Sequence, residues 1–346
     1  MSLPGRPKGE YRSAKHVGCL MSLPGSPKCE YRSAQHEGNP VNMHPAPRAR
    51  GASPGRPATL AIVVIPLLGG DALNRTLRSI QAISAPCFVV GGHAPPPHSG
   101  KGAAPIFIAS DLPVPERRAI GVAVSATEWV ALIEDTCDVG AGWLAACAEI
   151  AGADDVAAAG GPVTIVPSLP PRCMALACLE YAAYAPAGNN RGHAPEVMTT
   201  DRLAGLALLY RRSSLPPLRA GNGLIESEVN EVILTRGGRL LMHPGLAVEY
   251  RSADGDSATL ASRFSHGRIY GGGQRTRLGL WQRGLGALKC IALPVVMHGR
   301  AMRGLPAACR SRQATRIWIL ALSVAWSAGE LVGVLAGRGS SLARWK

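Results

Sequence analysis

The sequence lacks the cysteine patterns of a metal site or a disulfide framework. Its nine cysteines are odd in number and widely scattered, and they contain no CxxC pair and no paired Cys/His spacing. Structural zinc sites and disulfide-stapled domains need such spacings. We therefore expect reduced thiols, as in a cytoplasmic protein.

Acidic residues are scarce in the last quarter of the chain. Between Arg263 and Lys346 there are 14 basic residues and one acid, Glu330, so this segment carries most of the net charge of +14. Its six aromatic residues do not alternate regularly with the basic ones, as in a surface that stacks on bases, and its charges alternate instead with long apolar runs. This pattern favours an anionic membrane as a partner and argues against nucleic acid.

The first residues have no apolar run of 7 to 15 residues that could serve as a signal peptide. Instead, MSLPGRPKGEYRSAKHVGCL is followed at once by MSLPGSPKCEYRSAQHEGNP, a tandem repeat of twenty residues. Both copies are polar and rich in proline and glycine, with no face to bury. We predict a disordered leader over residues 1–57, with Met21 and Met43 as alternative starts.

Residues 58–255 contain alternating strand and helix patterns. The run TLAIVVIP, residues 59–66, is typical of a strand buried on both faces of a parallel sheet. Further strands are expected in CFVVGG, PIFIAS and WVALIED, with helices in DALNRTLRSIQA, ERRAIGVAVSATE and GWLAACAEIAG. The alternation predicts an α/β domain with a doubly wound, mostly parallel sheet. Its ligand crevice should lie beyond the carboxyl ends of the strands, at residues 66–70, 91–92 and 134–136.

Several blocks in this region occur in a family-specific order. They are VVIP, RRAIG, WVALIEDTCDVGAGWL, GGPV, LAGLALLYRRSSL and ESEVNEVILTRGGRLLMHPGLAVEY, within residues 59–251. In this order they resemble family 2 of the glycosyltransferases, which have the GT-A fold of the nucleotide-diphospho-sugar transferase superfamily. The resemblance implies a GT-A domain over residues 58–255, a nucleotide-sugar donor, and a membrane-associated bacterial enzyme.

The family's metal motif is altered in this chain. In the family a strand ends in DxD, whose carboxylates hold a divalent cation on the donor diphosphate. Here Glu134 and Asp135 stand at that place, and Thr136 replaces the second carboxylate. The resemblance implies Glu134 and Asp135 as weakened ligands of Mg²⁺ or Mn²⁺, with Asp135 also at the donor. The alternative is that these acids cap the following helix.

The resemblance also implies residues that bind the donor. Arg118 matches the family arginine that approaches the diphosphate, and a guanidinium suits phosphate because its fork donates two hydrogen bonds. The adjacent Arg117 is expected to be a solvated surface charge. Pro66, Leu67 and Gly91 are expected to form the nucleotide pocket. Family members often use an aspartate in this strand to recognise uracil, but the strand here reads CFVVGGH and contains none. The resemblance therefore does not imply specificity for uridine.

The catalytic base is implied by counting back from Gly237, which aligns Glu226 with the family's aspartate. Such a base must take a proton from an acceptor hydroxyl, so it needs a carboxylate on the acceptor side. Glu228 is the reserve candidate, and the alternative is that both glutamates cap a helix ending near Arg236. Gly205 and Tyr210 match the segment that lies on the acceptor side in the family. The alternative for Tyr210 is a purely structural role.

A third difference from the family lies at Tyr250, where members often have histidine. Together with Thr136 and Gly92, Tyr250 makes three positions at which the family's metal or nucleotide contacts are altered. Two hypotheses about function remain. The first is an inverting glycosyltransferase that moves a sugar from a nucleotide-diphosphate donor to a lipid-linked or polysaccharide acceptor. The second is a catalytically silent GT-A-like membrane protein that binds a glycan, a nucleotide or a partner synthase.

Residues 256–346 are predicted to form a basic, apolar, helical and membrane-associated region. The run 317–337 has 21 residues, enough at about 1.5 Å per residue to cross a hydrocarbon core of about 30 Å. The shorter run 285–297 is expected to enter a bilayer only partly, and the alternative is a pair of buried helices. Residues 274–278 weakly resemble a QxxRW signature without its tryptophan. A nucleotide-sugar domain must meet its donor in the cytoplasm, so we expect it on the cytoplasmic side of the inner membrane.

Overall fold

The computed structural model describes residues 59–92, 104–186, 197–218, 223–252, 259–306, 309 and 312–345. The chain divides into two units, Met1–His44 and Pro45–Lys346, and all described residues belong to the second. The predicted leader over residues 1–57 lies outside the described residues, so its disorder remains a prediction.

The second unit is built on an eight-stranded sheet of order β3-β2-β1-β4-β9-β6-β10-β8. Its strands are β1 (Leu60–Ile65), β2 (Cys87–Gly91), β3 (Ile106–Ala109), β4 (Trp129–Glu134), β6 (Val156–Gly160), β8 (Met198–Thr200), β9 (Ala207–Arg211) and β10 (Arg239–Met242). Strands β3, β2, β1 and β4 are mutually parallel, as are β6 and β10, whereas β9 runs antiparallel between β4 and β6 and β8 is antiparallel to β10. The predicted α/β fold with a mostly parallel sheet is confirmed.

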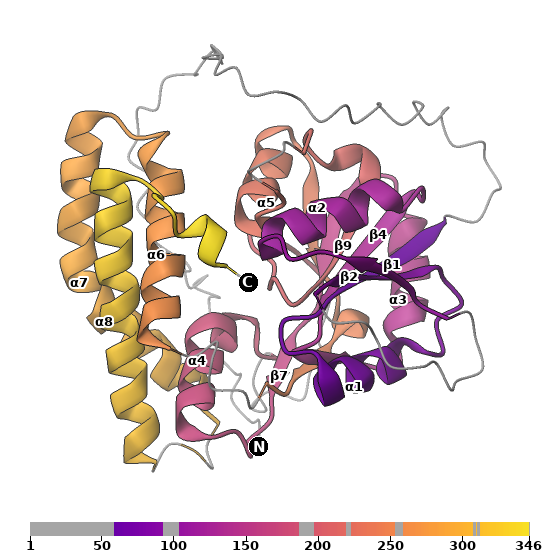
Figure 1. The fold of residues 1–346 in the computed structure, drawn as a ribbon, viewed down its shortest axis with the longest axis horizontal. Helices are drawn as coiled ribbons and strands as arrows, with labels where there is room; N and C mark the ends of the chain where they lie inside the picture. The colour runs from indigo at the N-terminus through magenta and orange to yellow at the C-terminus, as the bar shows by residue number, and fades with distance from the viewer. Residues whose placement is uncertain are drawn as a thin grey trace, which may run out of the picture. The chain divides into compact units, whose positions relative to one another are not determined.

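Helices cover both faces of this sheet (Figure 1). They are α1 (Gly70–Ile80), α2 (Val114–Val124), α3 (Trp143–Ala151) and α5 (Glu226–Thr235), whereas α4 (Pro171–Tyr181) packs beside residues 163–165. Alternate residues of β1 enter two separate cores: Ile62 and Val64 pack with α1 and α3, whereas Val63 and Ile65 pack with α2 and α5. This two-sided burial explains the continuous apolar run of the first strand.

A second, three-stranded sheet of order β5-β11-β7 adjoins the edge where ligands are expected. It consists of β5 (Cys137–Val139), β11 (Val248–Tyr250) and β7 (Val163–Ile165). Strand β4 ends at Glu134 and β5 begins at Cys137, so Asp135 and Thr136 form a two-residue connection between the two sheets. The acidic stretch therefore lies at the carboxyl end of β4, as the pattern predicted.

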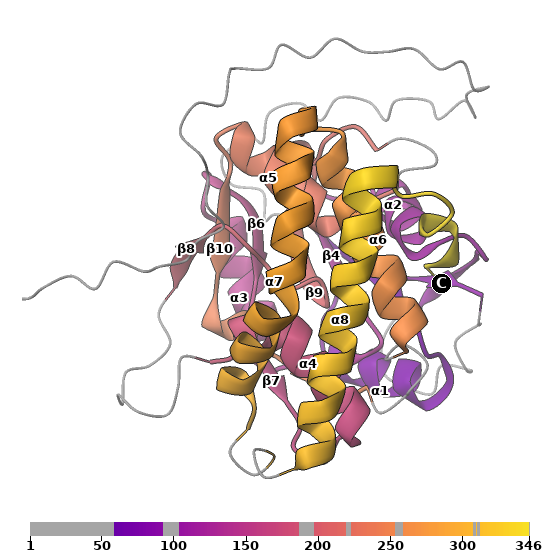
Figure 2. The ribbon, with the colours of Figure 1, turned by 90° about the vertical axis from the view of Figure 1, so that its left-hand side faces the viewer.

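Three further helices, α6 (Leu260–Arg275), α7 (Leu280–Gly304) and α8 (Gln313–Ala336), form a helical layer that follows the α/β domain. Figure 2 shows α7 and α8 side by side across this layer. Helix α8 packs on α6, α7 and α4. The apolar C-terminal helical region predicted from the sequence is therefore present.

By length and composition, α7 and α8 are the two described helices that could cross a membrane. The segment 317–337 predicted to span lies almost entirely in α8, and its crossing of a membrane remains a prediction. Residues 274–278, which weakly resemble QxxRW, lie at the end of α6, where Arg277 pairs with Glu231 on the surface.

Candidate active site

Asp135 organises the loop that follows β1. One carboxylate oxygen, Oδ1, accepts hydrogen bonds from the backbone N–H groups of Leu67 (2.8 Å) and Leu68 (3.2 Å). The other, Oδ2, accepts from Leu68 (3.0 Å) and Gly69 (2.7 Å). Asp135 is fully buried, and burial raises the pKa of its carboxyl although the three amides oppose this rise. Its charge is thus committed to holding the turn between β1 and α1.

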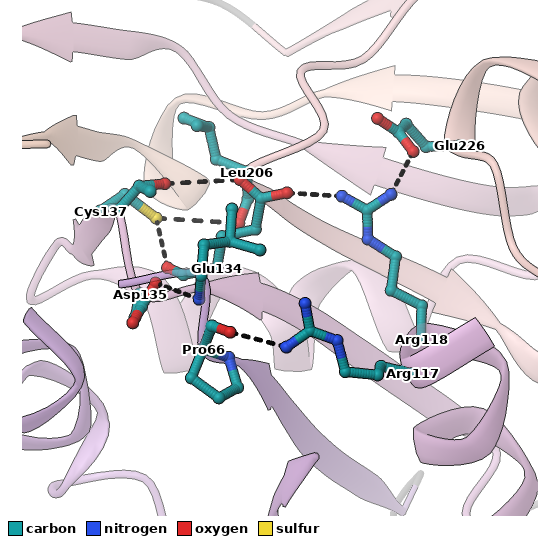
Figure 3. Close-up of polar contacts among 10 residues, drawn as sticks. Pro66, Arg117, Arg118, Glu134, Asp135, Cys137, Leu206 and Glu226 are labelled. Atoms are coloured by element: carbon teal, nitrogen blue, oxygen red, sulfur yellow. Dashed lines mark hydrogen bonds and ion pairs between the residues drawn. The ribbon is translucent and has the colours of Figure 1, made fainter. Parts of the chain in front are cut away.

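Arg118 lies at the centre of the candidate site (Figure 3). Its guanidinium donates through one terminal nitrogen to Glu134 Oε1 at 2.5 Å and through the other to Glu226 Oε2. The arginine side chain is 2% exposed. Burial lowers the pKa of Arg118, but the two carboxylates outweigh it and hold the pKa above its ordinary value. The structure therefore brings together, from α2, β4 and α5, three residues that the sequence analysis selected.

Glu134 is the end of β4 and lies almost entirely inside the protein. Its second oxygen, Oε2, accepts a hydrogen bond of 3.4 Å from the Thr136 hydroxyl. Burial raises the pKa of Glu134 to about 7, although Arg118 acts in the opposite direction. Thr136, which stands in place of a carboxylate, thus adds a donor rather than a metal ligand. Glu134 is consequently a carboxyl that changes charge near neutral pH.

Glu226 is the first residue of α5, and Gly205 lies directly against it. A Cβ atom at Gly205 would come within 2.6 Å of Glu226 Oε1. The predicted acceptor-side position Gly205 is therefore in contact with the side chain of the predicted base. Glu228, the reserve candidate, instead pairs with Arg338 after α8. The two glutamates thus have separate partners. Both lie in the first turn of α5, where the N-cap is Ile225 and no side chain makes a capping hydrogen bond.

Tyr210 is completely buried in β9, and its hydroxyl donates to Asn230 Oδ1 at 2.9 Å. This position supports the structural alternative for Tyr210 over contact with an acceptor. Tyr250 is also buried, in β11, and its ring packs at 5.0 Å from that of Tyr181.

The prediction for Arg117 was wrong. Arg117 is buried, at 5% exposed, instead of being a solvated surface charge. Its Nη1 donates to the Pro66 carbonyl oxygen at 2.8 Å. Arg117 thus reaches the loop after β1, and Arg118 reaches the start of α5. Gly91 packs against the same proline, since a Cβ there would lie 2.4 Å from Pro66 Cγ. Three of the predicted donor-site residues, Pro66, Leu67 and Gly91, therefore lie together at the carboxyl edge of the sheet, and Arg117 packs against them.

Sequence reasoning missed the side chains that the helical layer brings to this site. The Trp345 ring lies 5.7 Å from the Arg118 guanidinium and 5.0 Å from the His266 ring, and its carbonyl accepts from Val114 N–H at 2.8 Å. Burial, with Arg263 and Arg118 nearby, lowers the pKa of His266 to about 3. No local pattern predicts these contacts, because each joins Trp345 to a residue at least 79 positions away in the chain.

A second missed group is the ion pair between Arg263 of α6 and Glu180 of α4, at 2.5 Å. Glu180 also helps to raise the pKa of Glu134, so the charge of this pair influences the site. Asp111 was missed as well. It lies beside Gly92, where a Cβ would approach its Oδ1 to 2.9 Å, and its place after β3 at the carboxyl edge could have revealed it.

The carboxylates of the site do not form a preformed cation site. Within the described residues no group of three or more His, Cys, Asp or Glu side chains could hold a metal ion. Glu134 Oε1 and Glu226 Oε2 face the Arg118 guanidinium, and both oxygens of Asp135 face backbone amides. Each of the three carboxylates is thus already paired, so these residues as arranged do not fit the expected Mg²⁺ or Mn²⁺.

Comparison with known proteins gives likenesses in structure only. No protein-family model and no curated protein matches the sequence. The structure is similar to that of GalNAc-T7 with UDP, GalNAc and Mn²⁺, at 15% identity and a TM-score of 0.43, over 62% of this chain and 48% of that one. It is also similar to the mannosyltransferase PcManGT from Pyrobaculum calidifontis in complex with GDP-Man and Mn²⁺, at 15% identity and a TM-score of 0.46, over 83% and 91% of the chains. This chain thus spans about half the length of GalNAc-T7, and neither likeness assigns a reaction.

Proposed function

We propose that the chain is an inverting GT-A glycosyltransferase that moves a sugar from a nucleotide-diphosphate donor to a lipid-linked or polysaccharide acceptor. The observation that carries this proposal is Arg118, held between Glu134 and Glu226 at the carboxyl edge of the sheet. Open α/β sheets bind their ligands at this edge. The ordered sequence blocks that resemble family 2 agree with this assignment.

In the proposed donor complex, Arg118 donates to the diphosphate. Its fork suits two phosphate oxygens, and Glu134 keeps the guanidinium oriented from behind. Pro66, Leu67 and Gly91 lie together at the rim and provide the nucleotide pocket. Asp111 lies at the side of that pocket, where its carboxylate can accept a hydrogen bond from the nucleobase of the donor.

Glu226 is the proposed catalytic base. An acceptor hydroxyl oxygen attacks the anomeric carbon, the bond from that carbon to the donor phosphate oxygen breaks, and Glu226 takes the hydroxyl proton. The nucleoside diphosphate leaves with the bonding electron pair, and a single displacement inverts the anomeric centre. Binding of the diphosphate to Arg118 weakens its hold on Glu226, which frees the carboxylate to accept the proton.

The proposal contains no step that depends on a divalent cation, because Glu134 and Asp135 are committed to other partners. It places the helical layer at the cytoplasmic face of a bacterial inner membrane. There the site would be close to a lipid-linked acceptor.

Transfer assays with Glu226→Gln and the matched variant Glu228→Gln test this function. A general base contributes about 10² to 10⁴ in rate, so Glu226→Gln should lose transfer by that factor while Glu228→Gln keeps most of it. An unchanged rate in Glu226→Gln would remove Glu226 as the base. Circular dichroism of both variants controls for folding.

The second candidate function is a catalytically silent protein that binds a glycan, a nucleotide or a partner synthase. The observation that favours it is that Glu134 and Glu226 are both paired with one buried arginine, Arg118. If the wild type transfers no sugar from any nucleotide donor, this second function replaces the first.

A further inference from the structure

Helices α7 and α8 expose an apolar face that no described residue covers. On α7 it contains Leu280 (83% exposed), Trp281 (79%), Leu288 (64%), Ile291 (73%) and Val295 (74%). On α8 it contains Ile317 (61% exposed), Leu320 (48%) and Val324 (50%). These eight residues are called the apolar face below. Large exposed apolar patches are rare on soluble monomers and mark sites of interaction.

The spacing of these residues puts them on one side of each helix. Leu288, Ile291 and Val295 recur at intervals of three and four residues, as do Ile317, Leu320 and Val324. The two helices pack against each other and lie side by side in Figure 2. The apolar face therefore consists of one stripe along each of two adjacent helices rather than a ring around one of them.

The opposite side of α8 is held against α6 by direct backbone contact. A Cβ atom at Gly271 of α6 would lie 2.2 Å from the Glu330 carbonyl oxygen of α8. A Cβ at Gly329 of α8 would lie 2.0 Å from the Phe264 carbonyl oxygen of α6. Gly267 and Gly333 make equally close contacts one turn away. The two helices are thus in contact over several turns and must move together.

Helix α6 has no side suited to a hydrocarbon core. It carries Arg263, Arg268 and Arg275, and arginine is strongly disfavoured at the bilayer centre. Arg263 is paired with Glu180 of α4, which belongs to the α/β domain. If α8 crossed a membrane, α6 would have to enter it too, or the glycine contacts would have to break.

Cations border the apolar face. Lys289, Arg300 and Arg303 of α7 and Arg316 of α8 are exposed, and none is in an ion pair with another described residue. The single acid of the two helices, Glu330, is turned to Trp326 and accepts its indole N–H at 2.8 Å. Apolar residues bordered by cations suit an anionic phospholipid surface.

We propose that the apolar face lies flat in the interface of an anionic membrane, with α7 and α8 parallel to the bilayer rather than across it. The inference rests on the membrane association in the proposed function but not on sugar transfer. Trp281 and the bordering cations lie at the headgroups, and Ile291 and Val295 reach toward the acyl chains. The α/β domain then stays on the same side of the membrane as both ends of each helix.

Co-sedimentation of the full chain with sucrose-loaded vesicles tests the surface. We expect binding to phosphatidylcholine vesicles that contain phosphatidylglycerol, and weaker binding without it. Ile291→Glu/Val295→Glu should reduce binding about tenfold or more, because two buried apolar side chains become charged. The matched control Ile106→Glu/Leu144→Glu changes two exposed apolar residues of β3 and α3 (54% and 42% exposed) and should bind normally.

If the glutamate variant has a lowered melting temperature, Ile291→Ser/Val295→Ser replaces it. A wild type that binds no vesicles, or face variants that bind as well as the control, would overturn the proposal. Neither result bears on sugar transfer to a soluble acceptor, so the failure of this inference is distinguishable from failure of the proposed function.

Labelling with a membrane-impermeant maleimide tests the orientation. Arg303→Cys places a thiol at the end of α7, and Asp201→Cys places one on the exposed surface of the α/β domain. With the protein bound to the outside of vesicles, flat helices leave both thiols reactive, as read by mass spectrometry of each peptide. Protection at residue 303 with labelling at residue 201 would show that the helices cross the bilayer and would refute the flat arrangement.

Discussion

Replacing Gly271 by alanine should destabilise the contact between α6 and α8. The added Cβ would lie 2.2 Å from the Glu330 carbonyl oxygen and 3.0 Å from the backbone nitrogen of Val334. Both neighbours are backbone atoms of a helix, so they cannot turn away as a side chain could. Overpacking of this kind costs about 1–3 kcal/mol. Alanine favours a helix over glycine by only about 0.5–1 kcal/mol, so the steric cost decides the sign.

Gly299→Ala on α7 is the matched control. This glycine is also inside a helix, but a Cβ there meets no atom within 4 Å. Only the helix preference remains, so this variant should gain about 0.5–1 kcal/mol. Urea unfolding followed by circular dichroism measures both. If Gly271→Ala is as stable as Gly299→Ala, the helices are not in backbone contact, and the argument against a membrane-crossing α8 fails.

Three further outcomes follow from the site. Asp135→Asn should cost about 1–3 kcal/mol of folding free energy, because an amide nitrogen cannot accept from the loop N–H groups that now meet the second oxygen; urea unfolding at the wild-type level would contradict this. The pKa of Glu134 is raised from 4.5 to about 7, so the folded state holds the proton more tightly than the unfolded state. This contribution is present below about pH 4.5 and is lost as the pH rises through about 7. The free energy of unfolding of the wild type should therefore fall between about pH 5 and about pH 8, and the fall should be smaller in Glu134→Gln. An equal fall in the wild type and in Glu134→Gln would count against this prediction. Mn²⁺ without nucleotide should leave the melting temperature unchanged, whereas a clear rise would reveal a cation site that the paired carboxylates do not suggest.

Much of the fold could be predicted from the sequence because its signals are local. A continuous β-branched run marks β1, and helical spacing of Leu73, Leu77 and Ile80 marks α1; of these Leu73 and Ile80 are buried. The strands of the second sheet are three residues long, too short to show a period. Sheet pairing between β5 and β11 joins residues more than a hundred positions apart, so local pattern could not find it.

The candidate site was predictable only where family resemblance or strand ends indicated it. Glu134 ends a buried strand, and Arg118 and Glu226 were chosen by the order of the blocks. Arg117 was assigned to the surface because a charged residue is usually solvated, but its guanidinium has a carbonyl partner in Pro66. Trp345 reaches Arg118 only because α8 returns the chain to the site. Similarly, the apolar run of α8 matched a membrane span in length, while its packing against α6 depends on glycines whose partners lie in another helix.

The most direct measurement for the central claim is thermal protection of the purified full chain by nucleoside diphosphates. A panel of diphosphates, with the matching monophosphates and nucleosides as controls, should be measured with and without Mn²⁺. At least one diphosphate should raise the melting temperature with or without Mn²⁺, since a ligand at about 100 times its dissociation constant adds about 2.7 kcal/mol. The matching nucleoside, which cannot engage Arg118, should give little or no rise. If no diphosphate protects the protein under either condition, the site around Arg118 does not bind a nucleotide donor, and the proposed glycosyltransferase function is contradicted.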